Sequence, residues 1–157
     1  MTELIMLIGL PGSGKSTYIK KINKDNEYVV ISSDDILEEL AKLDGTDYNR
    51  AFAKHANFAG KEMFRRAEAA IKNGANIIWD QTNMNVKNRK RKLAMFPDTY
   101  TKRAVVFSID DGERNRRLKK RERETGKKIP DHVIKSMAAS YQAPTRGEGF
   151  SKIEYIK

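Results

Sequence analysis

Residues near the start of the chain have the types and the spacing of a phosphate-binding loop. Residues 9–16, GLPGSGKS, fit the pattern G-x-x-x-x-G-K-[ST], in which glycines let backbone N–H groups approach phosphate oxygens closely. An apolar run precedes this P-loop and a helix pattern follows it, which is the context that the motif needs. We therefore expect an ATP site in which Lys15 contacts the β- and γ-phosphates and the Ser16 hydroxyl binds Mg²⁺. The expected ATP-binding residues are Gly12, Ser13, Gly14, Lys15, Ser16 and Thr17.

Two adjacent acids follow the second apolar run, in the stretch VVISSDDILEEL at residues 29–40. Because ligands of parallel α/β sheets lie outside the carboxyl ends of the strands, we expect Asp34 and Asp35 at the edge that carries the P-loop. Asp34 could accept the proton of an attacking hydroxyl, as the aspartates of kinases do, with Asp35 binding substrate beside it. The alternative is a helix cap with acids in its first turn. The two roles are compatible, and both stay open at this point.

The third apolar run ends in a similar way, in IIWDQTNMNVKNRKRK at residues 77–92. Asp80 could orient a Mg²⁺-bound water, hold the Ser16 hydroxyl or fasten the neighbouring strand end. Asp80, Thr82 and Asn83 are expected to bind substrate, although Thr82 and Asn83 could equally form a polar turn. A basic helix follows, in which Arg89 is the expected substrate-binding residue; the alternative for that helix is a solvated face.

The most charged segment is GERNRRLKKRERETGKKIPDHVI at residues 112–134. Its arginines at 114, 117 and 121 fall near one helical face, and Arg123 comes just before the loop at 124–130. Arginines brought over a transferring phosphoryl group stabilise its charge, and a lid that carries them also excludes water. We therefore expect a lid at about 114–130 with Arg121 and Arg123 as catalytic residues and Arg114 as a substrate contact. The alternative is a surface helix with i,i+4 ion pairs.

The elements that must position these residues follow from the apolar pattern. Near-continuous apolar runs predict parallel strands covered on both faces, at 4–9, 28–32, 76–80, 104–109 and 151–156. Helical patterns alternate with them at 15–23, 34–43, 48–73, 86–95, 111–124 and 131–141. This alternation predicts one α/β domain over 1–157, a three-layer sandwich around a mostly parallel five-stranded sheet. Three phenylalanines of the long helix, at 52, 58 and 64, are expected in the core.

Charge is distributed unevenly along the chain. The net charge is +10, and residues 1–80 carry a net of −1 while residues 81–157 carry a net of +11. This separation favours a polyanion-binding face over a merely solvated surface.

With no cysteine, the chain has no disulfide framework and no cysteine-based zinc site. The opening residues have neither a signal-peptide pattern nor a membrane span, so we expect no membrane partner and a cytoplasmic location, the host cytoplasm if the protein is viral.

Taken together, these segments resemble the kinase domain of polynucleotide 5′-kinases, which occur in bacteriophage, bacterial and animal end-healing enzymes. GLPGSGKST, VVISSDD, DQTNMNVKNRKR, RERETGKKIP and YQAPTRGEGF are each similar to a segment of that family. The resemblance implies a P-loop NTPase fold, ATP and Mg²⁺ as cofactors, and transfer of the γ-phosphoryl group to the 5′-hydroxyl of a nucleic acid, DNA more than RNA. It also implies that Asp34 activates the hydroxyl, that Asp80, Thr82 and Asn83 form the D-x-T-N segment, and that Arg121 and Arg123 belong to the lid.

One position departs from the family pattern. Members usually carry an arginine three residues after the catalytic aspartate, where it binds the phosphate next to the acceptor, and here that residue is Leu37. Arg114 could take this role instead. Otherwise the acceptor differs, as in related viral kinases thought to phosphorylate hydroxymethyl groups of bases such as 5-hydroxymethyluracil within DNA, a form of DNA modification in phage. Weaker alternatives are a small-metabolite kinase and a non-catalytic, ATP-sensing nucleic-acid-binding module.

Overall fold

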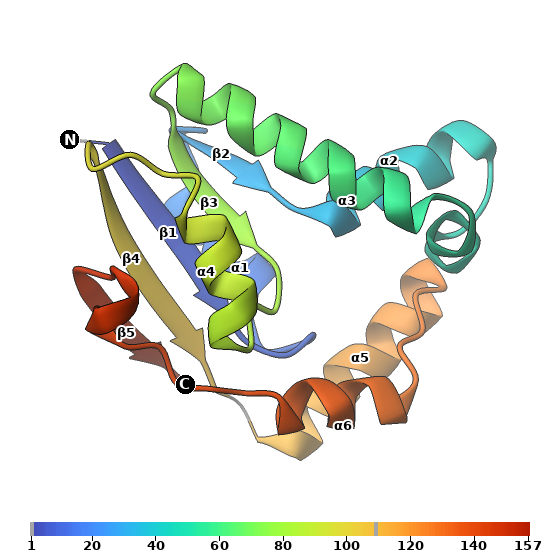
Figure 1. Cartoon of the computed structure of the whole chain (residues 1–157). Helices are drawn as coiled ribbons and strands as arrows, with labels where there is room; N and C mark the ends of the chain where they lie inside the picture. Colours follow the sequence, from blue (N-terminus) through green and yellow to red (C-terminus); the bar gives the residue numbers. More distant parts are fainter. Residues whose placement is uncertain (1, 109) are drawn as a thin grey trace.

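The apolar runs of the chain form one sheet whose strand pairings are all parallel in the part of the chain that the structure describes. The computed structural model describes residues 2–108 and 110–157. The strand order is β2-β3-β1-β4-β5 (Figure 1). The strands are β1 (Thr2–Ile8), β2 (Tyr28–Ile31), β3 (Asn76–Asp80), β4 (Tyr100–Phe107) and β5 (Lys152–Ile156). The predicted five-stranded parallel arrangement is confirmed.

The central strand explains the continuous apolar pattern. Residues Leu4 to Ile8 of β1 are all 0% exposed, and Met6 pairs with Trp79 of β3 on one side and with Ala104 of β4 on the other. A strand with neighbours on both sides and helices over both faces has no position for a polar side chain. The predicted strand at 104–109 begins earlier, at Tyr100, because its polar first half pairs with the start of β1. Its expected last residue, Ile109, lies outside the described residues.

Helices cover both faces of the sheet, which confirms the three-layer sandwich. Leu4, Met6 and Ile8 face a core shared with α2, α3 and α4, whereas Ile5 and Leu7 face α1. The helices are α1 (Lys15–Ile22), α2 (Ser33–Asp44), α3 (Tyr48–Lys72), α4 (Val86–Leu93), α5 (Asp111–Thr125) and α6 (Asp131–Ala139), with a short 3₁₀ turn at Arg146–Glu148.

The long helix α3 corrects one expectation about the core. Its buried stripe runs through Ala51, Ala59, Met63 and further alanines towards its end, and these recur at helical spacing. Phe52 and Phe58 fall outside that stripe and are 52% and 54% exposed, so neither is a core residue. Phe64, by contrast, is half-buried and packs against this core, with its ring edge-to-face to that of Trp79.

Helices α5 and α6 lie beyond the carboxyl ends of the strands, on the side of the P-loop (Figure 1). Helix α5 has no buried residue and α6 has one, Ile134. We call residues 111–139, which comprise α5, the following loop and α6, the lid segment. Within residues 2–108 and 110–157, no helix combines the length and the apolar character needed to cross a membrane.

Candidate active site

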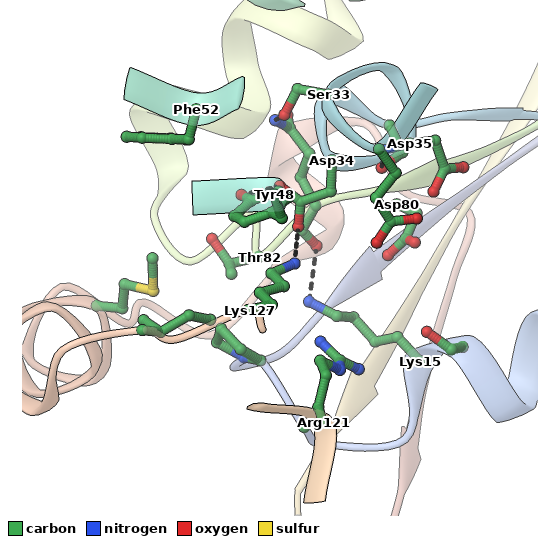
Figure 2. Close-up of a pocket in the computed structure, with 18 of the residues that line it drawn as sticks. Lys15, Ser33, Asp34, Asp35, Tyr48, Phe52, Asp80, Thr82, Arg121 and Lys127 are labelled. Atoms are coloured by element: carbon green, nitrogen blue, oxygen red, sulfur yellow. Dashed lines mark hydrogen bonds and ion pairs between the residues drawn. The ribbon is translucent and has the colours of Figure 1, made fainter. Parts of the chain in front are cut away.

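A cavity of about 1020 Å³ lies where the carboxyl ends of the strands meet the P-loop and the lid segment. Figure 2 shows Lys15, Lys127 and Arg121 on one side of this cavity and the carboxylates of Asp34, Asp35 and Asp80 on the other. Four predicted site residues, Ser13, Arg89, Arg114 and Arg123, are not among those that line it. The predicted residues that do line it are Gly12, Gly14, Lys15, Ser16, Thr17, Asp34, Asp35, Asp80, Thr82, Asn83 and Arg121.

The P-loop is shaped by its glycines. A Cβ atom on Gly9 would lie 2.7 Å from the Ser13 hydroxyl oxygen, and Gly12 and Gly14 have φ angles of +81° and +105°. Side-chain-bearing residues adopt neither arrangement without strain. The Lys15 ammonium donates to the Gly9 carbonyl at 2.7 Å, and its burial lowers the Lys15 pKa to about 8 despite the nearby carboxylates.

These features fit a nucleoside triphosphate with its magnesium ion. The loop turns tightly, α1 begins at Lys15, and the Ser16 hydroxyl is exposed at that helix end. No group of three His, Asp or Glu side chains in the described residues could hold a metal by itself. The residues present therefore suit a metal that arrives with phosphate, to which Ser16 would add a hydroxyl oxygen.

At the end of β2, the residue that caps α2 and the candidate base are different residues. The Ser32 hydroxyl caps α2 by accepting the backbone N–H of Asp35 at 3.3 Å, so Asp34 is not the cap. Instead, Asp34 Oδ1 accepts from the Tyr48 hydroxyl at 2.7 Å, and Oδ2 accepts from the Lys127 ammonium at 2.8 Å (Figure 2). Burial alone would raise the pKa of Asp34, but the Lys127 ammonium and these hydrogen bonds hold it below its ordinary value.

Two further carboxylates complete an acidic wall. Burial, together with Asp80, Glu38 and Asp34, raises the pKa of Asp35 to about 6. Burial likewise raises the pKa of Asp80, although the Lys15 ammonium opposes the change. Asp34 is thus the one of the three whose surroundings favour the charged form.

The segment after β3 supports the P-loop. The backbone N–H of Gly9 donates to the Thr82 carbonyl at 3.0 Å, and the Asn83 amide donates to the Leu7 carbonyl at 2.7 Å. The Lys92 ammonium donates to the other end of the Asn83 amide, and Asn83 is only 2% exposed. Asn83 therefore fixes the strand end in place, whereas Thr82 is half-buried at the cavity wall.

Arg89 does not lie where its expected role needs it. Its side chain is 0% exposed and forms an ion pair at 2.8 Å with Glu148, and it also donates to the Asn83 carbonyl at 2.9 Å. On α4, Arg89, Lys92 and Leu93 face inward, so the basic stretch is not one solvated face. Arg91 is the arginine of this helix that lines the cavity, where its guanidinium lies 4.3 Å from the centre of the Phe64 ring.

The arginines of the lid segment also divide between different places. Arg121 lines the cavity, while Arg123 is exposed and does not. Arg114 packs against Gly12 and lines a second, smaller hollow, so it is not placed to clamp the acceptor. Arg117 lines the main cavity next to Gly14.

Leu37 of α2 stands where the polynucleotide kinases usually carry a phosphate-binding arginine. It is 2% exposed within the core, so a phosphate clamp at that position would be buried.

Comparison with known proteins now decides the family. A family model described as an AAA domain matches residues 4–144. The chain belongs to this AAA domain family. Its fold is that of P-loop kinases, and the resemblance to polynucleotide kinases inferred from the motifs is confirmed.

Curated relatives of this AAA domain carry several names. The chain is 26% identical over 98% of its length to heterogeneous nuclear ribonucleoprotein U-like protein 2 of Mus musculus, but spans only 21% of that protein. It is 28% identical over 90% of its length to L-seryl-tRNA(Sec) kinase of Methanococcus maripaludis, of which it covers 53%. It is 22% identical over 98% of its length to bifunctional polynucleotide phosphatase/kinase of Schizosaccharomyces pombe, of which it covers 33%.

Solved structures share the fold of this AAA domain. A chain of the Pnkp1/Rnl/Hen1 RNA repair complex superposes with a TM-score of 0.69 and 25% identity, over 88% of this chain and 43% of that one. A gluconokinase from Sinorhizobium meliloti superposes with a TM-score of 0.59 and 13% identity, over 98% of this chain and 81% of that one. At that identity, the second likeness concerns the fold alone.

Sequence reasoning missed several residues of this P-loop kinase site. Lys127 was overlooked although it follows Gly126, whose φ of +76° ends α5 and turns the chain back towards the cavity. Phe52 was assigned to the core but lines the cavity, as does Tyr48 at the start of the same helix. The glycine after the arginine run was the available signal for Lys127; nothing local marks Tyr48.

Proposed function

We propose that this chain is an ATP-dependent kinase that transfers the γ-phosphoryl group to the 5′-hydroxyl end of a polynucleotide, DNA in preference to RNA. The observation that carries the proposal is the placement of Asp34 in one cavity with the P-loop lysine, Lys15. A proton acceptor and a phosphate-binding loop in one cavity are the two parts that transfer to a hydroxyl needs.

The chemistry assigns a role to each of these groups. Asp34 accepts the proton of the acceptor hydroxyl while its oxygen attacks the γ-phosphorus, and the bond between the γ-phosphorus and the bridging oxygen breaks to release ADP. Lys15 and Arg121 stabilise the negative charge that spreads over the phosphoryl oxygens. Magnesium, when bound, neutralises phosphate charge, and the Ser16 hydroxyl would help to hold it.

The acceptor side of the cavity supports a nucleotide rather than a free sugar acid. Tyr48, Phe52 and Phe64 supply aromatic rings on which a base could stack. Arg91 and Lys128 line the same cavity and suit the phosphates of a polynucleotide. These cations belong to the half of the chain that carries the net charge of +11.

A base hydroxymethyl group within DNA is the second candidate acceptor. It is favoured by the burial of Leu37, because that position of α2 is part of the core and holds no arginine for the phosphate next to a 5′-hydroxyl. An aromatic wall would serve a base turned out of the duplex as well as a base at a strand end.

A transfer assay with labelled γ-phosphate separates these candidates. Three DNAs of one sequence are compared, bearing a 5′-hydroxyl, a 5′-phosphate, or a 5′-phosphate together with 5-hydroxymethyluracil. We expect label on the first DNA only, and expect phosphatase to remove it from the end. Internal label on the third DNA would establish the second candidate instead. Label on gluconate and on no polynucleotide would make the protein a metabolite kinase, and a matched 5′-hydroxyl RNA tests the preference for DNA.

A further inference from the structure

The loop after α5 places one ammonium group directly on the candidate base. Lys127 has a side chain that is 6% exposed, and its Nζ lies 2.8 Å from Asp34 Oδ2. The same ammonium lies 4.3 Å from the centre of the Tyr48 ring. The backbone supports this insertion, because the Lys127 N–H donates to the Thr125 hydroxyl at 3.2 Å directly after the turn at Gly126.

This contact leaves Asp34 poorly prepared to act as a base. One carboxylate oxygen accepts from Tyr48 and the other accepts from Lys127. A carboxylate beside an ammonium binds a proton less readily, which opposes removal of a proton from an acceptor hydroxyl. The side chain of Asp34 is nevertheless 49% exposed, so an acceptor can reach it if the ammonium moves.

We propose that Lys127 is a further catalytic residue that exchanges between two anions, holding Asp34 until a γ-phosphate occupies the P-loop and then moving to the phosphoryl oxygens. One movement frees the base and also neutralises the group that is transferred. The proposal rests on the phosphoryl transfer proposed above, but not on the identity of the acceptor.

The surroundings of Asp34 make this exchange physically reasonable. Lys127 and Lys15 line the same cavity, and their ammonium groups are close enough for the Lys127 charge to lower the pKa of Lys15. A terminal phosphate carries more negative charge than one carboxylate, and the flexible lysine stem allows its single charged group to change partner. The charged and titratable groups that face Asp34 are Lys127 and Arg121 of the lid segment, Tyr48 of α3, Lys15 of α1, Asp80 of β3, and Asp35 and Glu38 of α2.

The test follows the Asp34 carboxyl by carbon NMR in ¹³C-labelled protein, with the resonance assigned by its loss in Asp34→Asn. Wild type and Lys127→Met are titrated without nucleotide, with ADP, and with a non-hydrolysable ATP analogue. Without nucleotide, we expect the Asp34 pKa to be higher in Lys127→Met than in wild type, because the cation is gone. In wild type the analogue should raise this pKa more than ADP does.

Lys127→Met also measures how much the γ-phosphate by itself raises the pKa of Asp34. In Lys127→Met, the analogue should raise the Asp34 pKa less than it does in wild type, because only the direct effect of the phosphate remains. An equal rise in both proteins would overturn the proposal. If Lys127→Met does not fold, the ¹⁵Nζ resonance of Lys127 in wild type replaces it. That resonance should shift with the analogue and not with ADP, and the same spectrum with both would overturn the proposal.

Kinetics give the second readout, with Lys119→Met as the matched control, because Lys119 is an exposed lysine of α5 that does not line the cavity. We expect Lys127→Met to lower kcat for transfer by roughly 10²-fold, as expected when one cation is removed from a transferring group. The acid limb of kcat/KM should move to higher pH, because that limb reports the free enzyme. A loss no larger than that of Lys119→Met, or an unmoved acid limb, would contradict the proposal. If wild type labels no polynucleotide while the NMR exchange occurs, the acceptor assignment fails and the role of Lys127 stands.

Discussion

The acidic wall and the lid segment face each other across one cavity but are held in place differently. Asp34 and Asp35 lie in the first turn of α2, directly after β2, and Asp80 is the last residue of β3, whose apolar residues are 0% exposed. The segment after β3 is bonded to the P-loop itself. Helix α5 buries no residue, and two of its arginines, Arg116 and Arg117, pair with Glu113 of the same helix. Such exposed pairs contribute little stability, so the carboxylates have fixed positions while the cations can change partner.

The two sides of the cavity also come from halves of the chain that differ in net charge. The three carboxylates belong to the half of the chain with a net charge of −1, and the lid cations belong to the half with +11. The uneven distribution along the sequence thus becomes two facing surfaces of one site. Changes on the fixed side should therefore abolish chemistry, whereas changes on the lid side should alter rate and substrate binding by degrees.

The largest effect is expected at the P-loop. Lys15→Ala should remove detectable transfer, because the variant lacks the P-loop ammonium that the Gly9 carbonyl holds beside the expected phosphates. The fold should survive, since the Lys15 side chain bonds to backbone carbonyls and its charge is costly to bury. Label transfer and the thermal unfolding midpoint measure the two outcomes. Turnover near that of wild type would contradict the P-loop assignment.

The next largest effect on the rate should distinguish two neighbouring carboxylates of the acidic wall. Asp34→Asn should lower the rate of the chemical step by roughly 10²–10⁴-fold, as expected for loss of a general base. Asp35→Asn should lower it less, because the surroundings of Asp34 favour the charged carboxylate, whereas burial and neighbouring acids raise the pKa of Asp35. Single-turnover transfer measures both variants. A greater loss in Asp35→Asn would reassign the base to Asp35.

A smaller effect should separate two basic neighbours on α4. Arg91 lines the cavity and stacks on Phe64, whereas Lys90 is exposed and does not line it. Arg91→Ala should raise the KM of a polynucleotide acceptor by roughly 10-fold or more, as expected for loss of a hydrogen bond to a charged group. Lys90→Ala is the control and should change it little. Equal changes in both variants would mean that α4 contributes only general positive charge.

The smallest effect concerns the two predicted lid arginines. Arg121 lines the cavity and Arg123 does not, so Arg121→Ala should lower kcat and Arg123→Ala should leave it within about twofold. Steady-state transfer at saturating ATP and acceptor measures the difference. A larger loss in Arg123→Ala would indicate that the lid turns on substrate binding and brings the other face of α5 to the cavity.

Much of this protein was determined by local sequence. The P-loop, the parallel strands and the acids after them were predicted because each depends on neighbours along the chain. A strand that is buried on both faces ends where the sequence becomes polar. The polar residues that follow it therefore lie at the carboxyl edge of the sheet, where ligands of such sheets bind. Helix boundaries were accurate to within a few residues for the same reason.

Tertiary structure alone decided which members of each charged or polar run face the cavity. Arg89 turns inward because Glu148 satisfies it, a residue 59 positions away, and Lys127 reaches Asp34 across 93 positions. Phe52 is left outside the core because alanines and Met63 form the buried stripe of α3. Burial of a charge depends on finding its counter-charge in space, and no local pattern carries that information. The sequence therefore determined the edge of the sheet where the site lies, and packing decided which side chains complete it.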